Sequence, residues 1–178
     1  MDLQLTRIDD RLIHGQVVVG WVRALKIERL VVANDTIASN AMQRTLMEMA
    51  VPSGLKVSLW TILEAVEASR SGRSPERVLL LFGNPHDALA YVRAGGKVSS
   101  LNVGGMHFCN GKRQVCPTVC VDDRDVQAFK DLKALGLELE VRAVPSDSKE
   151  PLEKYLPELK GEAPHSQRET TPPANPGK

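Results

Sequence analysis

The sequence predicts an α/β protein with a doubly wound, mostly parallel open sheet and helices on both faces. Short aliphatic runs alternate with amphipathic stretches of about ten residues, which is the pattern of successive βαβ units. Runs such as residues 78–82 (VLLLF) are apolar at every position, as expected for strands that are covered on both faces. Glycine and proline separate these segments, for example at Pro52 and Gly136.

The expected strands follow from the short apolar runs. Residues 3–8 alternate in polarity like a half-buried strand, whereas residues 29–33 form a buried run. The full set of expected strands is 3–8, 29–33, 56–60, 77–82, 98–103, 119–121 and 137–141.

The expected helices lie between these strands. Asp122 supplies an N-cap before Val126, and glycines at 95 and 136 suit left-handed C-terminal caps. The pattern changes beyond Pro145, where we expect a short docking helix over residues 149–159. The other expected helices are 16–25, 39–50, 62–68, 85–94 and 122–135.

One folded domain is expected over residues 1–160, because 178 residues is close to the size of one ordinary domain. Residues 161–178 contain four prolines, two glycines and no valine, isoleucine, leucine or aromatic residue. Such a segment buries too little apolar surface to offset the entropy lost on ordering. We therefore expect a disordered C-terminal tail.

The composition excludes several classes of protein. The 23 basic and 22 acidic residues leave a formal charge of +1, which argues against a nucleic-acid binder or a polybasic membrane anchor. The apolar runs are much shorter than the roughly 20 residues that span a bilayer, and residues 1–5 do not resemble a secretory signal. Three cysteines are most simply free thiols in a reducing cytoplasm, so we expect a cytoplasmic protein.

The segment RIDDRLIHGQV at residues 7–17 carries the candidate chemistry. It follows the first strand, and ligands of open α/β sheets bind at the carboxyl ends of strands where the chain order reverses. His14 and Gly15 directly precede a helix, whose free backbone N–H groups favour an anion. A neutral histidine at such a position is a nucleophile.

Charged neighbours complete this candidate anion site. Arg7 and Arg11 can donate charge-assisted hydrogen bonds to phosphoryl oxygens. Asp10 or Asp9 could hold the non-reacting ring nitrogen or fix the position of an arginine. The alternative is a solvated loop histidine beside an ion pair of little energetic value.

Other polar residues follow neighbouring strands. Asn34 and Asp35 either line the same site or cap the next helix, and a cap is the favoured interpretation. His86 either faces the site or caps its helix, with the cap again favoured. The Gly104-Gly105 pair before His107 indicates only a tight turn, and the loop either forms part of the rim or contacts a partner.

The remaining candidates have structural interpretations. The cysteine spacing lacks the paired C-x2-C of a zinc site, so we expect no metal, and the disfavoured alternative is a loop that gathers its thiols for a metal or redox role. Trp21 and Trp60 are expected in the core. The cysteines are Cys109, Cys116 and Cys120.

The string at residues 7–17, followed by Trp21, closely resembles the active-site segment of IIB components of the mannose/fructose/sorbose family of the sugar phosphotransferase system. The resemblance extends from about residue 3 to about residue 156. Further similar stretches are VAND at 32–35, LNVGGMH at 101–107, VDD at 121–123 and VRAVPSD at 141–147.

The resemblance implies a phosphocarrier domain. In this family the loop histidine accepts a phosphoryl group from a phosphohistidine of the IIA domain and passes it to a sugar held by the membrane components IIC and IID. His14 matches that histidine, and Arg11 matches the arginine expected to contact the phosphoryl group. Arg7 and Asp10 match supporting positions, with Gly15, Asn34 and Asp35 as further supporting candidates.

The implied enzyme is a protein-phosphohistidine–sugar phosphotransferase of the EC 2.7.1 type, without a cofactor. It would reach the membrane only through its partners. A regulatory phosphoprotein with the same His14 chemistry is the alternative function, and its discriminating feature is the absence of IIC and IID genes nearby. A metabolite-binding module is disfavoured because no glycine-rich phosphate loop follows the first strand. The sugar, the modified ring nitrogen and homo-oligomerisation stay open.

Overall fold

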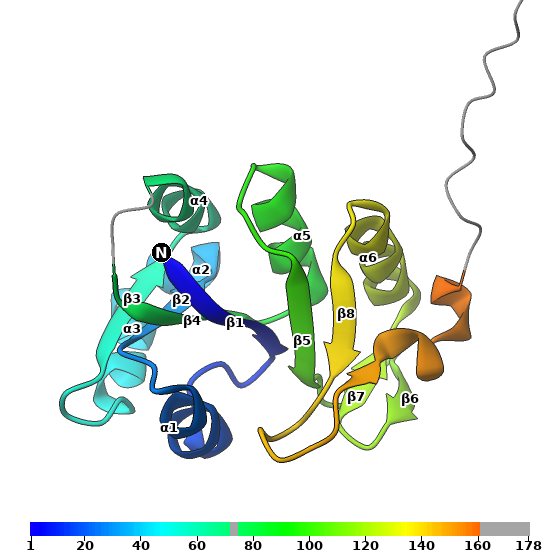
Figure 1. Cartoon of the computed structure of the whole chain (residues 1–178), viewed down its shortest axis with the longest axis horizontal. Coiled ribbons are helices and arrows are strands. Elements are labelled where there is room, and N and C mark those ends of the chain that lie inside the picture. Colours follow the sequence, from blue (N-terminus) through cyan, green and yellow to red (C-terminus); the bar gives the residue numbers. More distant parts are fainter. Residues whose placement is uncertain (72–74, 161–178) are drawn as a thin grey trace, which may run out of the picture.

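The computed structural model describes residues 1–71 and 75–160. The tail expected over residues 161–178 lies outside these described residues. Within them the chain forms an open, mostly parallel sheet with helices on both faces (Figure 1), so the predicted fold class is confirmed.

The strands of the main sheet lie in the order β3-β2-β4-β1-β5-β8-β9. Every neighbouring pair is parallel except β8 and β9, and a separate antiparallel hairpin joins β6 to β7. The strands are β1 (Asp2–Asp9), β2 (Arg29–Ala33), β3 (Lys56–Trp60), β4 (Arg77–Phe82), β5 (Ser100–Gly105), β6 (Arg113–Cys116), β7 (Val119–Val121), β8 (Glu138–Val141) and β9 (Glu150–Pro151).

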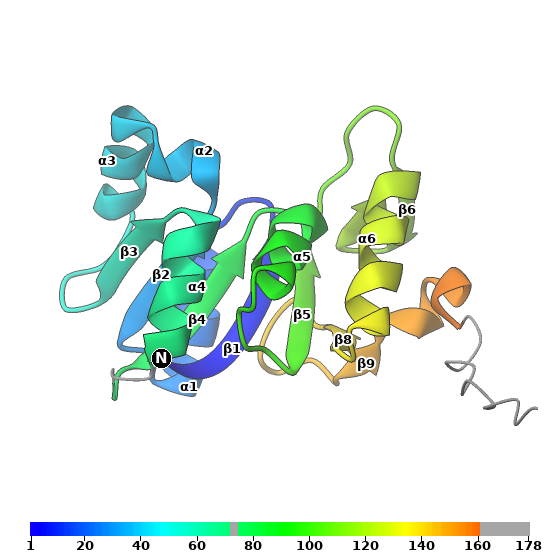
Figure 2. The same ribbon diagram turned by 90° about the horizontal axis from the view of Figure 1, so that it is seen from above.

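The helices lie on opposite faces of the sheet (Figures 1 and 2). Helices α4, α5 and α6 cover one face, while η1 and α1 cover the other. The helical segments are η1 (Gln16–Trp21, a π-helix), α1 (Val22–Leu25), α2 (Asp35–Ala38), α3 (Ala41–Met49), α4 (Ile62–Ser71), α5 (Pro85–Arg93), α6 (Asp123–Ala134) and the 3-10 turns η2 (Leu152–Lys154) and η3 (Pro157–Leu159).

Two apolar cores follow from this layering, and β4 contributes to both. Leu79 and Leu81 pack in the core beneath η1, whereas Leu80 and Phe82 pack in the core beneath α4, α5 and α6. All four side chains are almost completely buried, and each contributes about 1.5–3 kcal/mol of transfer free energy. A strand covered on both faces has no solvent side, which explains its continuous apolar run.

Most of the predicted elements are present. Strands β2, β3, β4 and β7 have the predicted bounds, and β1 and β8 differ from them by one residue. Strand β5 begins and ends two residues later than predicted. The predicted helix over residues 16–25 is present, but its first part is a π-helix, in which the β-branched run Val17-Val18-Val19 and Gly20 weaken the α preference.

The expectation of a docking helix over residues 149–159 is wrong. This segment forms β9 on the sheet edge, followed by the two short turns η2 and η3. Pro151 and Pro157 explain the difference, because proline lacks the backbone N–H and clashes with the preceding turn of a helix. Leu152, Leu156 and Leu159 still dock by burying their side chains against the core.

Strand β1 occupies the centre of the fold. The chain leaves β1 for β2 and β3, returns to β4 beside β1, and then crosses to β5 on its other side. The segment after β1 enters η1 on one face, whereas β4 leads into α5 on the opposite face. The carboxyl end of β1 therefore lies at the switch in chain direction where ligand sites form in such sheets.

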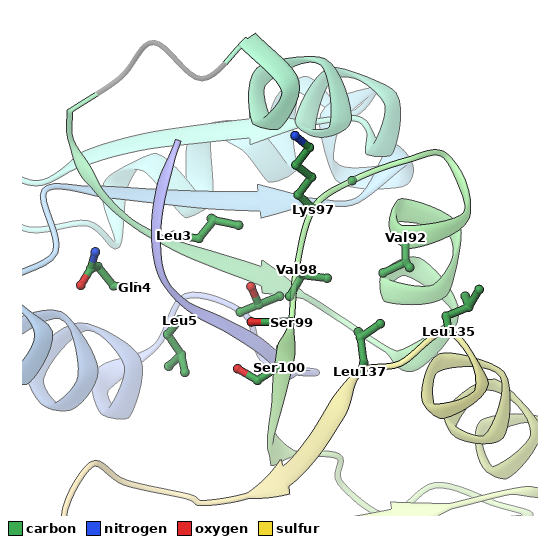
Figure 3. A pocket seen from close by; sticks show the side chains of 12 residues that line it. Leu3, Gln4, Leu5, Val92, Lys97, Val98, Ser99, Ser100, Leu135 and Leu137 are labelled. Carbon is green, nitrogen blue, oxygen red and sulfur yellow. The ribbon is translucent and has the colours of Figure 1, made fainter. Parts of the chain in front are cut away.

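A groove of about 600 Å³ lies at the opposite, amino-terminal end of β1 (Figure 3). It opens because β1 pairs with β5 only from Arg7 onward, so that the two strands diverge before that residue. Leu3 and Leu5 line one wall, and Ser99 and Ser100 line the other. This groove is separate from the residue 7–17 loop and takes no part in the candidate site.

Glu76 links two neighbouring strands just before β4. It accepts a hydrogen bond of 2.6 Å from Arg29 Nε and pairs with Lys56, and these bonds lower the pKa of Glu76 to about 2. A carboxyl group whose pKa is lowered in the folded state stabilises the fold above its unfolded pKa, and this contribution is lost as the pH falls.

We expect Glu76→Gln to lower the melting temperature at pH 7. The difference from the wild type should shrink between about pH 4.5 and pH 2, as the wild-type carboxyl becomes protonated. Thermal melts over this pH range measure the effect, and Glu48→Gln on the exposed surface of α3 is the control at pH 7. A deficit that stayed constant down to pH 2 would contradict the assignment.

Candidate functional site

The loop after β1 is fixed by a left-handed turn. Leu12 has a φ of 53°, and its N–H donates to the carbonyl of Asp9 at 2.9 Å. The side chains of Leu12 and Ile13 are buried in the core beneath η1, which holds the backbone in this strained conformation. His14 follows directly. Gly15 then leads into the π-helix with ordinary helical dihedral angles, and nothing lies within 4 Å of the place that a β-carbon would take there.

Arg7 and Asp9 form a completely buried ion pair on β1. Arg7 Nη2 donates to Asp9 Oδ2 at 2.8 Å, and Arg7 Nε donates to the same oxygen at 3.3 Å. The other donors reach Asn102 Oδ1 and the carbonyls of Arg142 and Ala143. All five guanidinium N–H groups therefore have acceptors, which is the condition for burying such a charge.

Two glycines of β5 make room for this pair. A β-carbon on Gly104 would lie 1.7 Å from Cζ of Arg7, and one on Gly105 would lie 3.2 Å from Oδ1 of Asp9. Neither glycine has a positive φ, and both belong to a strand. The prediction of a tight turn at this pair is therefore wrong. The side chain of Arg7 approaches the backbone of β5 too closely for a β-carbon at position 104, and Asp9 leaves little room for one at position 105.

The buried guanidinium also contacts an aromatic ring. Burial lowers the pKa of Arg7, and the charge of Asp9 opposes that shift. Arg7 Cζ lies 5.4 Å and Arg142 Cζ 5.0 Å from the centre of the Trp21 ring, within cation–π range. Trp21 Nε1 donates to the carbonyl of Ala143 at 3.2 Å, so this tryptophan is a core residue as predicted.

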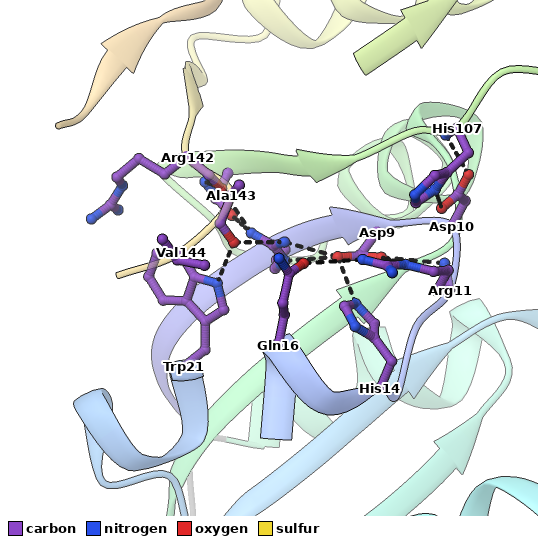
Figure 4. A network of polar contacts seen from close by, with 12 residues as sticks. Asp9, Asp10, Arg11, His14, Gln16, Trp21, His107, Arg142, Ala143 and Val144 are labelled. Atoms are coloured by element: carbon purple, nitrogen blue, oxygen red, sulfur yellow. Dashed lines mark hydrogen bonds and ion pairs between the residues drawn. The ribbon is translucent and has the colours of Figure 1, made fainter. Parts of the chain in front are cut away.

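His14 faces the same aspartate. Its Nε2 lies 2.9 Å from Asp9 Oδ2, the oxygen that also accepts from Arg7 (Figure 4). Nε2 is shielded from solvent, and its angle of approach is outside the range of a hydrogen bond, so the contact is electrostatic. The His14 side chain is 15% exposed, which leaves it recessed but reachable.

Arg11 lies at the solvent side of this arrangement. Its side chain is 48% exposed, and Nη2 donates to Gln16 Oε1 at 3.0 Å. Its Nε is 3.8 Å from Asp9 Oδ1, and its backbone N–H donates to that oxygen at 3.2 Å. Asp9 thus joins two arginines and His14, while one guanidinium edge remains open to a ligand.

Asp10 points away from His14 and binds a different histidine. Asp10 Oδ2 accepts from the backbone N–H of His107 at 2.6 Å, and Oδ1 lies 2.7 Å from His107 Nδ1. Of the two aspartates that the sequence left open for holding His14, the structure brings Asp9 into contact with it.

Asn34 and Asp35 act at neighbouring helix ends. Asn34 accepts from the N–H of Ile37 as the N-cap of α2 and donates to Asp87 at 2.8 Å. Asp35 Oδ1 accepts from the N–H of Ile62 at the start of α4. These bonds agree with the favoured cap interpretation, and within the described residues no hydrogen bond or ion pair joins either side chain to His14.

His86 belongs to another cluster on the same edge. Asn84, not His86, caps α5, and His86 Nε2 lies 3.3 Å from Asp125 Oδ1. The prediction that His86 caps the helix is therefore wrong. Asn84, two residues earlier, has a shorter side chain that accepts a hydrogen bond from the free N–H of Asp87.

The described residues hold no group of three potential metal ligands from histidine, cysteine, aspartate or glutamate. The cysteines are free thiols, one exposed and two buried. These are Cys109, Cys116 and Cys120.

Several parts of the site had no recognisable signal in the sequence. Asn102, Gln16 and His107 each contact a site residue, although periodicity and spacing do not point to any of these contacts. Gly104-Gly105 was the one available signal, because paired glycines within a strand indicate close approach of other groups.

The fold and the site together define a doubly wound α/β protein with a recessed histidine at the switch point, beside a buried aspartate that also contacts an exposed arginine. Among the described residues, no helix is both long enough and apolar enough to cross a bilayer.

The family described as "PTS system sorbose subfamily IIB component" matches residues 3–167. The chain belongs to this family. It is a IIB component of a sugar phosphotransferase system, and such components are phosphotransferases in sugar uptake that work with IIA and with the membrane proteins IIC and IID.

Individual relatives agree with this assignment. The sorbose-specific EIIB component of Klebsiella pneumoniae is 41% identical over 148 residues, which are 83% of this chain and 90% of that protein. The crystal structure of the IIBSor domain of the sorbose permease from that organism has a TM-score of 0.82 at 39% identity and covers 89% of this chain and 98% of that one. The mannose-specific EIIAB component of Escherichia coli K12 is 42% identical over 84% of this chain, but the match spans 46% of that longer protein.

We expect Gly104→Ala to destabilise the fold by about 3 kcal/mol, because the added methyl group must displace the Arg7 guanidinium from its buried acceptors. Urea denaturation measures the loss. Gly15→Ala is the matched control, since nothing lies within 4 Å of its β-carbon position, and its stability should equal or slightly exceed the wild type. Equal stabilities for the two variants would contradict the close-approach interpretation.

Proposed function

We propose that His14 accepts a phosphoryl group from a phosphohistidine of a IIA domain or protein and passes it to a sugar held by IIC and IID. The observation that carries this proposal is the contact between His14 Nε2 and Asp9, whose carboxylate is fixed by buried Arg7. A histidine needs one ring nitrogen held and the other free to act as a defined nucleophile.

The contact with Asp9 supports Nδ1 as the nucleophilic nitrogen. Asp9 favours the tautomer with hydrogen on Nε2, which leaves the lone pair on Nδ1. The Nδ1–P bond forms as the N–P bond of the donor imidazole breaks, and the donor nitrogen keeps the released electron pair. The phosphorylated ring is cationic, and the Asp9 carboxylate stabilises that charge.

Arg11 is proposed to bind the phosphoryl oxygens during transfer. Phosphoryl transfer has a loose transition state with its negative charge on the equatorial oxygens, so positioned cations lower its barrier. The exposed guanidinium lies beside the same aspartate that holds His14. Supporting roles follow for Arg7 through Asp9, for Asp10 and Gly15 through the loop, and for Asn34 and Asp35 through the adjacent helix ends.

The recessed position of His14 suits a relay. A phosphoramidate is labile to water, and a ring that is only 15% exposed meets little bulk solvent, while a docked partner would exclude more of it. The proposed class is a protein-phosphohistidine–sugar phosphotransferase in the cytoplasm, bound to the membrane through its partners. The name of the mannose-specific EIIAB relative, in which a matching segment is part of a longer protein, supports a IIA partner.

Labelling tests the acceptor. We expect one acid-labile phosphoryl group per chain after incubation with phosphoenolpyruvate, enzyme I, HPr and a cognate IIA, with NMR assigning it to His14 Nδ1. His14→Ala should abolish the label, because it removes the nucleophile. His86→Ala is the matched control and should keep full labelling, since His86 contacts Asp125 on a separate cluster. Label that persists in His14→Ala would place the acceptor elsewhere.

Transfer kinetics test the arginine. We expect Arg11→Ala to slow single-turnover transfer from phosphorylated IIA at least tenfold, since a charged contact to a transition state contributes about 1.4 kcal/mol or more. Arg11→Lys should recover part of the rate, because it restores the charge without the planar pair of donors. Arg113→Ala is the control, because this exposed arginine of β6 pairs with Glu158 of η3 and not with a residue of the His14 loop. An unchanged rate in Arg11→Ala would refute the role.

A further inference from the structure

We propose that His107 is a positioning residue for phosphoryl transfer: its bonds to Asp10 fasten the His14 loop to the segment that follows β5. The inference rests on the proposed function of His14 and adds to it a second histidine, on another part of the chain, that acts without touching the phosphoryl group.

Asp10 is attached to residues 105–107 at three points. Its backbone N–H donates to the carbonyl of Gly105 at 3.0 Å. Its carboxylate accepts the backbone N–H of His107 at 2.6 Å through Oδ2 and meets the ring Nδ1 at 2.7 Å through Oδ1. An ionised carboxylate only accepts hydrogen bonds, so Nδ1 carries the hydrogen in this contact.

This attachment lies at the start of a strained loop. Asp10 directly precedes Arg11 and Leu12, and Leu12 has the left-handed φ of 53°. A non-glycine residue in that conformation costs roughly 1–2 kcal/mol, so the loop would relax if its anchors were weakened. Leu12 and Ile13 anchor one side of the loop in the core, and the Asp10–His107 contact anchors the other.

The geometry favours positioning over global stabilisation. The side chains of Asp10 and His107 are 33% and 55% exposed, and ion pairs with such exposure contribute little to unfolding free energy. A small displacement of Arg11 or His14 is expensive for catalysis, because phosphoryl transfer needs aligned atoms and misplacement by about 1 Å can cost a factor of 100. Loss of the His107 ring should therefore affect the rate far more than the melting temperature.

Three variants separate the nitrogens of the ring. Asparagine places its amide nitrogen near the position of Nδ1 and can still donate to Asp10, whereas glutamine places its amide nitrogen near Nε2. Alanine removes both. Single-turnover transfer from phosphorylated IIA is measured at increasing IIA concentration for His107→Ala, His107→Asn and His107→Gln, with His86→Ala as the control for loss of an exposed, aspartate-paired histidine.

We expect His107→Ala to lower the rate at saturating IIA about tenfold, with the half-saturating IIA concentration within twofold of the wild type. His107→Asn should return the rate to within twofold, while His107→Gln stays slow. Hydrogen exchange at the Leu12 amide, which bonds to Asp9, should accelerate in the alanine variant and not in the asparagine variant.

Other outcomes overturn the proposal. A wild-type rate in His107→Ala removes the role, and rescue by glutamine alone indicates a direct Nε2 contact instead. A raised half-saturating concentration with an unchanged maximal rate makes His107 a docking residue. The final amount of label on His14 should reach the wild-type value in every His107 variant, so a failure here is distinct from a failure of His14 as acceptor.

Discussion

The buried pair of Arg7 and Asp9 is the interaction on which the candidate site depends. Both side chains are completely buried on the central strand, where an unpaired charge would cost several kcal/mol. Arg7 meets this cost by using all five of its N–H groups, and Asp9 meets it by accepting from Arg7 and the backbone of Arg11. His14 is added to a carboxylate whose position is already determined.

The partners of Arg7 come from separate parts of the chain. Asn102 belongs to β5, the accepting carbonyls of Arg142 and Ala143 follow β8, and Trp21 belongs to the π-helix. The frame beneath His14 is therefore assembled from β1, β5, the segment after β8 and the π-helix. The loop above it is anchored by the buried side chains of Leu12 and Ile13, while the side chain of Arg11 stays exposed.

The sequence predicted the strands and helices of the α/β fold better than the contacts between particular side chains. Continuous apolar runs such as that of β4 determine buried parallel strands, and their bounds were predicted to the residue. The π-helix, the strand β6 and the turns after Pro151 were not predicted, because each depends on tertiary packing or on local breaks that periodicity does not reveal. The residues of the His14 loop were identified as a group from their density of charge.

The partners within that group could not be predicted. Asp9 and Asp10 are chemically identical neighbours, and only the direction of their side chains at the end of β1 separates the one beside His14 from the one beside His107. The glycine pair signals close approach, but the group that approaches Gly104 could not be predicted, because it belongs to Arg7, almost a hundred positions earlier.

The central position of β1 has a consequence for biosynthesis. This strand is translated well before its two neighbours, because β4 and β5 end at Phe82 and Gly105. Until Gly105 has been translated, β1 lacks one or both of its neighbours, and Arg7 lacks its acceptors on Asn102 and beyond. The nascent chain must therefore keep β1, with its apolar residues Leu3, Leu5 and Ile8, unpaired for several seconds at the usual elongation rate of about 5–20 residues per second. Chaperone binding would protect the chain from aggregation during this period.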